Sequence, residues 1–401
     1  MVSDSRPIEG LDYSDLLIAL AAATAAPLLV DLLPIPRIPP IVTEILAGIV
    51  IGPQVLDWVT IDAPLEVFSQ VGLVLLFFLA GLEIAFDAED ERHLGAVGAA
   101  FALSLGLALM VALGFEAAGL ADTPLLIAIV LAATSFGIVV AVLKDAAKTT
   151  TSFGQLVIAG ASLADFATVV LLSLFFSASG ASFENTLVLL ALFLGLVAAV
   201  GVVLAGARAS GRLRAAIVRM HRTSAQISVR IAFLLLAGLV YMSEEFGLEV
   251  VLGAFLAGAM VSLLDRDRDV AKSGLQAKLD GIGFGVFIPM FFVVSGVRLD
   301  LEALFSSAGT LVLVPLTVIA LLLIRGLPAL LYRRFLTRRR VLAAGLLQAT
   351  SLSFIVAATQ IGIELGKLDT AAAAGLVAGG VVSVLVFPTV ALRLLGQEQP
   401  A

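Results

Sequence analysis

The sequence is organised around one apolar stretch, Ile158–Ala159–Gly160–Ala161–Ser162–Leu163–Ala164–Asp165–Phe166–Ala167–Thr168–Val169–Val170. Apolar residues continue on both sides, from about Leu156 to about Phe176. This is long enough for a helix to cross a bilayer, which takes roughly 20 residues. A carboxylate at mid-membrane costs roughly 2.5–3.5 kcal/mol on insertion scales, and such residues usually face a cavity or a partner. Asp165 is therefore the first candidate for a functional residue.

The composition places the chain in a membrane. Of its 401 residues, 60% are hydrophobic and only 14% are charged, and the mean hydropathy is +1.12. A soluble domain of this length would need far more charge to cover its surface. The apolar segments are continuous, whereas the strands of an outer-membrane barrel would alternate. We therefore expect an all-α polytopic membrane protein.

The chain contains no cysteine, which excludes disulfides and thiolate metal sites. Its two histidines, His93 and His221, fall in polar connections, which argues against a histidine metal cluster. No cofactor is expected. The acidic N-terminus lacks the basic region of a cleaved signal peptide, so the first apolar segment is expected to remain as a helix.

Thirteen segments are long and apolar enough to be expected as membrane spans. Their approximate ranges are 14–33, 38–56, 64–86, 93–118, 121–143, 152–178, 184–206, 224–243, 246–264, 280–297, 306–332, 339–363 and 369–395.

The loops predict the orientation. Of the 24 lysines and arginines, twenty lie on the side of the connections that follow odd-numbered spans, three lie on the opposite side, and Arg325 lies within a span. By the positive-inside rule the basic side is cytoplasmic. The N-terminus is then outside and the C-terminus inside a cell (inner) membrane.

The two halves of the chain echo each other. Ala133–Thr134–Ser135 reappears as Ala349–Thr350–Ser351, and the pattern at 77–83 is echoed at 292–298 with almost the same offset. An odd number of spans separates the halves, so they would insert upside down, as inverted repeats of secondary transporters do. The expected organisation is a polar outer tail (1–13), a first repeat (14–178), a linking span (184–206), a second repeat (224–395) and a short cytoplasmic tail (396–401), with no soluble regulatory domain.

Asp165 has two interpretations. One is a carboxylate that alternately binds a proton and a metal cation, since a low dielectric disfavours the charged form. The other is a structural aspartate paired with a buried base. We favour the first, because ionisable groups within membranes are usually functional. Ser162 lies on the same predicted span and is grouped with this site.

Two hydroxyl pairs occupy corresponding places in the halves. Thr134–Ser135 and Thr350–Ser351 each lie in the middle of a span. Hydroxyls can bend helices, and a broken helix would present carbonyls and amides at mid-membrane. Oxygen ligands suit hard cations. Singly these would be ordinary packing hydroxyls, but as a pair they predict two broken helices at a cation site.

Two further charged residues are assigned to charge compensation. Arg325 lies deep in a span, beside Gly326 and Pro328. It is expected to neutralise carbonyls of the broken helices or to pair with the site carboxylate; the alternative is that it snorkels to the cytoplasmic headgroups. Glu83, near the end of its span, is either a second acidic group on the ion path or an interfacial cap.

Several runs together resemble one family. The run Pro40–Pro53, the run Phe77–Glu83 and the run Phe287–Gly296 are similar, in order, to the second-, third- and tenth-span patterns of the monovalent cation/proton antiporters. The resemblance is greatest to the branch of the potassium-efflux and bacterial sodium/proton antiporters, and it extends over nearly all of the chain.

The resemblance implies a fold of twelve or thirteen helices, with a dimerisation domain and a six-helix core in which two broken helices cross beside an essential aspartate. Asp165 is similar to that aspartate, Thr134–Ser135 and Thr350–Ser351 to the breaks, and Arg325 to a basic residue associated with electroneutral members. Ala164 departs from the family, which usually has Asp, Asn or Gln there.

The sequence therefore predicts an electroneutral antiporter, not an enzyme, exchanging sodium or potassium for protons at Asp165. We expect a homodimer among lipids, without nucleic-acid partners and without a nucleotide-binding domain in the chain. The alternative is a sodium-coupled symporter of an organic anion on a related fold. Spacing does not separate sodium from potassium.

Overall fold

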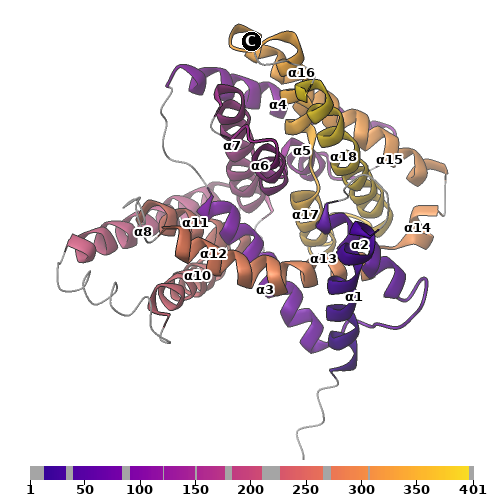
Figure 1. The fold of residues 1–401 in the computed structure, drawn as a ribbon, viewed down its shortest axis with the longest axis horizontal. Coiled ribbons are helices and arrows are strands. Elements are labelled where there is room, and N and C mark those ends of the chain that lie inside the picture. Colours follow the sequence, from indigo (N-terminus) through magenta and orange to yellow (C-terminus); the bar gives the residue numbers. More distant parts are fainter. Residues whose placement is uncertain are drawn as a thin grey trace, which may run out of the picture. The chain divides into compact units, whose positions relative to one another are not determined.

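The computed structural model describes residues 13–32, 39–83, 91–120, 122–149, 151–176, 183–209, 226–264, 272–305 and 308–396. The regular secondary structure of these residues is helical, without strands (Figure 1). Eleven of these helices are long and apolar enough to cross a membrane, and two shorter apolar helices, Pro40–Ile51 and Val250–Leu263, fall in the predicted second and ninth spans. The all-α membrane class is confirmed, while the total of thirteen spans stays a prediction.

The chain forms two compact units. One comprises Met1–Leu76 and Asp280–Leu301, and the other comprises Phe77–Leu279 and Glu302–Ala401. Three helices, α3 (Ala63–Leu82), α12 (Lys272–Ile282) and α14 (Leu301–Phe305), contain the boundaries between them. The division into two inverted repeats with a linking span follows the order of the sequence instead, and it stays a prediction.

The first unit is built on a close crossing of α2 (Pro40–Ile51) and α13 (Ile288–Val297), with α1 (Ser14–Asp31) packed against both. A π-helical turn, η1 (Gly283–Phe287), precedes α13. At the crossing, a Cβ on Gly48 would meet the carbonyl of Val293, and one on Gly296 would meet the carbonyl of Ile45. Small residues let membrane helices approach to backbone contact in this way.

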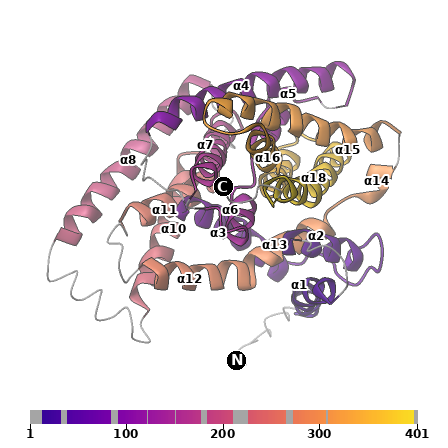
Figure 2. The same cartoon turned by 45° about the horizontal axis from the view of Figure 1, so that its top comes forward.

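The second unit contains the remaining helices. They are α4 (Glu91–Ala117), α5 (Pro124–Ala132), α6 (Phe136–Asp145), α7 (Ser152–Phe175), α8 (Phe183–Ala209), α10 (Ile227–Glu245), α11 (Val250–Leu264), most of α14 (Leu301–Phe305), α15 (Ala308–Leu321), the π-turn η2 (Leu322–Gly326), the 3-10 helix η3 (Leu327–Arg334), α16 (Arg338–Ala349), α17 (Ser353–Glu364) and α18 (Thr370–Gly396). Helix α18 packs against α15, α16 and α17 (Figure 2).

A second close crossing lies within this unit, between the end of α3 and α11. A Cβ on Gly81 would meet the carbonyl of Phe255, and one on Gly258 would meet that of Phe78. Gly81 and Gly296 occupy matching places in the two predicted repeats, and each packs against the backbone of a neighbouring helix. This similarity supports the repeat hypothesis without establishing it.

Both predicted helix breaks are present. Helix α5 ends at Ala132 and α6 begins at Phe136, so the first interruption covers 133–135. Helix α16 ends at Ala349 and α17 begins at Ser353, so the second covers 350–352. The two meet directly, because the Ser135 N–H donates to the Thr350 carbonyl (2.9 Å).

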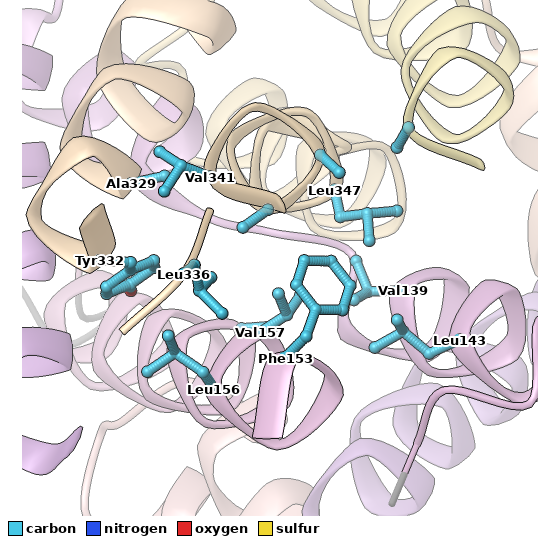
Figure 3. Close-up of a cluster of buried hydrophobic side chains, with 14 of the residues drawn as sticks. Val139, Leu143, Phe153, Leu156, Val157, Ala329, Tyr332, Leu336, Val341 and Leu347 are labelled. Atoms are coloured by element: carbon cyan, nitrogen blue, oxygen red, sulfur yellow. The ribbon is translucent and has the colours of Figure 1, made fainter. Parts of the chain in front are cut away.

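An apolar cluster holds the broken helices in place. It is formed by α4, α6, α7, η3, the turn that follows η3, α16 and α18, and Figure 3 shows part of it. Val139 from α6, Phe153 and Val157 from α7, and Leu347 from α16 gather there, and all are buried. The cluster thus packs one half of each broken helix, α6 after the first break and α16 before the second.

The α2–α13 crossing gives a test of the fold. Gly48→Ala would drive a methyl group into the Val293 carbonyl, and overpacking of this kind typically costs about 1–3 kcal/mol. We expect a lower midpoint of thermal unfolding in detergent.

The matched control is Gly106→Ala on α4, where a Cβ would meet nothing within 4 Å. Alanine is a better helix former than glycine, so this variant should unfold at the same or a higher temperature. Equal behaviour of the two variants would contradict the close crossing.

Candidate functional site

Ser135, a residue of the first break, caps α17, the helix that follows the second break. The Ser135 hydroxyl oxygen accepts hydrogen bonds from the N–H groups of Leu352 (2.7 Å) and Ser353 (3.1 Å), where α17 begins. The first N–H groups of a helix have no partner within that helix, and a serine hydroxyl is among the best acceptors for them. In a membrane no water would replace it. Ser135 therefore stabilises a helix more than 200 residues away in sequence.

Asp165 caps α6, the helix that begins after the first break. The N–H of Phe136, the first residue of α6, donates to Asp165 Oδ2 (3.3 Å). The N-terminal end of a helix carries partial positive charge and favours an anion. The second oxygen, Oδ1, is buried and has no hydrogen-bond partner among the described residues. One carboxylate oxygen is thus held by the fold, and the other is left to bind something else.

Arg325 lies inside the protein, 1% exposed, which excludes snorkelling to the headgroups. Its Nε donates to Thr134 Oγ1 (2.9 Å), and its two terminal nitrogens donate to Ser104 Oγ (3.2 Å) and the Gly160 carbonyl (3.3 Å). The guanidinium also lies over the ring of Phe101, 5.7 Å from its centroid. These contacts replace part of the hydration lost on burial.

Local backbone geometry puts Arg325 there. The residue belongs to the π-turn η2, which interrupts the helix that begins as α15. π-turns of this kind are frequent at functional sites. The following residue, Gly326, lies against α16 at Gly345, where an added Cβ would meet the Gly326 carbonyl at 2.8 Å. Helices can approach this closely only where side chains are absent.

Thr134 connects the buried charge to the second broken helix. Its hydroxyl accepts from Arg325 and donates to the carbonyl of Gln348 (2.8 Å), in the last turn of α16. The C-terminal end of a helix carries partial negative charge, which a nearby cation stabilises. Arg325 is thus linked to a carbonyl of the broken helix through one hydroxyl, and its role in charge compensation stays a prediction. Among the described residues, its side-chain hydrogen bonds go to Thr134, Ser104 and Gly160 and not to Asp165.

The structure adds residues that the sequence reasoning did not single out. Ser104 and the Gly160 carbonyl accept from Arg325, and the Ser383 hydroxyl accepts from the Ser351 N–H (3.1 Å). The Gln348 side chain donates to the Tyr332 hydroxyl (3.1 Å). A Cβ on Gly160 would displace the Gln348 amide. The signal available in the sequence was position, because Gln348 lies two residues before the first residue of the second break, Thr350.

The remaining candidates are placed as follows. Thr350 is buried and its hydroxyl donates to the Leu346 carbonyl of α16, the helix that it follows (3.1 Å). Ser351 is buried, and its hydroxyl has no hydrogen-bond partner among the residues described. Ser162 is half-buried on α7, about one turn before Asp165, and Glu83 follows directly after α3. The assignment of Glu83 to charge compensation stays a prediction.

The Thr134 link gives a stability test. Thr134→Val removes the acceptor of a buried guanidinium N–H and the donor to Gln348, and unsatisfied buried groups of this kind cost about 1–3 kcal/mol each. We expect a clear drop in the midpoint of thermal unfolding in detergent.

Thr359→Val is the matched control. Thr359 is equally buried, but its hydroxyl donates to the Ile355 carbonyl (2.7 Å) of its own helix and joins no second element. A drop as large as that of Thr134→Val would show that the link between elements contributes nothing.

Known proteins share this architecture. The solved structure of the sodium/proton antiporter MjNhaP1 from Methanocaldococcus jannaschii superimposes with a TM-score of 0.68, covering 95% of this chain and 98% of its own, at 20% identity. At that identity the match shows the fold alone.

Sequence relatives agree. A Na+/H+ antiporter of Enterococcus hirae is 30% identical over 88% of this chain and 91% of its own length. YjbQ of Bacillus subtilis, named as a candidate Na+/H+ antiporter, is 32% identical over 96% of this chain, which spans 64% of the length of YjbQ. The model of the family described as sodium/hydrogen exchanger, transmembrane, matches residues 18–395. The chain therefore belongs to the transmembrane sodium/hydrogen exchangers, a family of transporters rather than enzymes.

Proposed function

We propose that this protein exchanges sodium or potassium for protons across the cell (inner) membrane, with Asp165 as the one site for which proton and cation compete. The observation that carries the proposal is the different environment of the two oxygens of the Asp165 carboxylate. Oδ2 is held by the first N–H of α6, and Oδ1 is buried without a partner among the described residues. The free oxygen can take a proton or become a cation ligand.

The environment of Asp165 supports alternating access. An ionised carboxylate without a partner is costly in low dielectric, whereas the protonated and the cation-bound forms carry no net charge. Only the protonated and the cation-bound forms of Asp165 would then move across the membrane with the moving unit. A unit that has carried a cation in one direction must therefore return with a proton. Arg325 keeps its charge throughout and is fixed by three hydrogen bonds.

Oxygen atoms near the breaks would complete the cation site. Hard monovalent cations prefer carbonyl, hydroxyl and carboxylate oxygens. We propose Asp165 as the charged ligand and the polar groups at the two breaks and on α7 as neutral ligands, namely Thr134, Ser135, Ser162, Thr350 and Ser351. Of these, the Ser351 hydroxyl is the one whose buried oxygen has no partner among the residues described.

We also propose that the exchange is electroneutral and that the protein is a homodimer. Within each chain, one of the two units would move against the other. The Gly281–Gly285 segment, which begins two residues after the boundary between Leu279 and Asp280, is a candidate hinge. A Cβ on Gly281 or Gly285 would meet nothing within 4 Å, so packing does not explain these glycines, and the π-turn η1 begins within the segment, at Gly283. The proposed orientation keeps the N-terminus outside and the C-terminus cytoplasmic.

Removal of the Asp165 charge should abolish exchange. Asp165→Asn can neither carry the proton nor neutralise the cation, so proteoliposomes containing it should show no cation-driven change of an internal pH dye. Asp122→Asn, the same chemical change at an exposed position, should transport as the wild type does. A wild type that moves no protons in response to sodium or potassium, or undiminished exchange by Asp165→Asn, would refute the proposal.

A single exchangeable carboxylate predicts that one proton moves for each cation. When the cation and pH gradients are set to balance at this ratio, net transport should vanish at every membrane potential, with the potential clamped by an ion that the protein does not carry. Net transport whose direction reverses with the potential would show charge movement and contradict electroneutrality. Dependence of the rate alone on the potential would not decide the matter.

A further inference from the structure

The loop between α2 and α3 (residues 52–62) has an unusual distribution of side chains. Three of its large apolar residues are exposed: Val55 is 53% exposed, Leu56 is 40% exposed and Trp58 is 59% exposed, whereas Val59 is buried. Trp58 is the only tryptophan in the chain. In a loop surrounded by water, apolar side chains are expected to turn inward, because burial stabilises by roughly 25 cal/mol per Å².

Polar side chains of the same loop bind neighbouring parts of their own unit. The Asp15 carboxylate, at the start of α1, accepts from the Thr60 N–H (3.1 Å) and hydroxyl (3.0 Å). Gln54 donates to Asp300 (3.2 Å) and accepts from the N–H of Leu301. The loop is thus tied by polar bonds to both α1 and the segment that follows α13. Polar bonds therefore hold the loop against its own unit while three of its apolar side chains stay exposed.

The backbone fixes the apolar side chains in this position. The N–H groups of Leu56, Asp57 and Trp58 donate to the carbonyls of Val50 (3.1 Å), Gly52 (2.9 Å) and Ile51 (3.0 Å). Asp57 adopts a left-handed conformation, with φ of 52°. A turn held by so many bonds cannot easily collapse to bury Trp58, so its exposed apolar face requires a partner.

We propose that Val55, Leu56 and Trp58 insert into the interfacial region of the bilayer and anchor the first unit there. The loop directly follows the apolar helix α2 and precedes the membrane helix α3. Its apolar face continues from Leu46 and Val50, two exposed side chains one turn apart on α2, each 45% exposed. Tryptophan is enriched where bilayer meets water, because its ring is apolar and its N–H is polar. Phospholipid would therefore cover the exposed side chains of Val55, Leu56 and Trp58.

The single tryptophan makes the proposal directly measurable. The full-length wild type is reconstituted in phosphatidylcholine vesicles whose acyl chains carry bromine either near the headgroup or near the chain end. We expect bromine near the headgroup to remove a larger fraction of the Trp58 emission than bromine near the chain end. An aqueous quencher should have less effect on the protein in vesicles than on the unfolded chain.

A deep reporter provides the control. In a Trp58→Phe background, Leu192→Trp places the only tryptophan near the middle of the α8 span, at a position 58% exposed. The order of the two brominated lipids should reverse for this variant.

Two results would overturn the proposal. Trp58 emission quenched from water and unaffected by either brominated lipid would place the loop outside the bilayer. Emission insensitive to both kinds of quencher would mean that protein, such as a second copy of the chain, covers the loop.

Discussion

Breaking two helices inside a membrane frees backbone groups that no water can satisfy, and the structure around Asp165 is the answer to that constraint. The N–H groups at the start of α17 donate to the Ser135 hydroxyl, and the first N–H of α6 donates to Asp165. A carbonyl at the end of α16 accepts from Thr134, whose oxygen in turn accepts from Arg325. Each break therefore supplies a partner for the other.

The two helix starts are not equivalent, and this difference locates the proposed chemistry. A neutral hydroxyl, which does not titrate in the physiological range, caps α17. A carboxylate caps α6, and it alone can exchange a proton for a cation. The buried Arg325 is a fixed charge whose desolvation is offset by three hydrogen bonds and an aromatic ring. The proposed transport thus depends on a carboxylate, Asp165, whose charge a proton or a cation can neutralise, beside a guanidinium, Arg325, whose charge is permanent.

The sequence predicted the features that are costly in an apolar setting. A carboxylate and a guanidinium within membrane spans are visible without a structure, and so are hydroxyl pairs repeated in two halves. Gln348, Ser104 and Ser383 were missed because one uncharged polar residue in an apolar helix is cheap and common. Their partners lie far along the chain, as in the contact of Arg325 with Ser104, and spacing does not report such contacts. Glycine and proline near Arg325 hinted at an irregular helix, but only the structure shows a π-turn.

If proton and cation compete for the Asp165 carboxylate, binding of the cation must release the proton. This release can be measured directly. Purified protein in weakly buffered detergent solution is titrated with sodium or potassium chloride while a dye reports pH, with choline chloride as the control for ionic strength. We expect saturable release of one proton for each cation bound, absent from Asp165→Asn. Cation binding by the wild type without proton release, or release that survives in Asp165→Asn, would contradict competition for this one carboxylate.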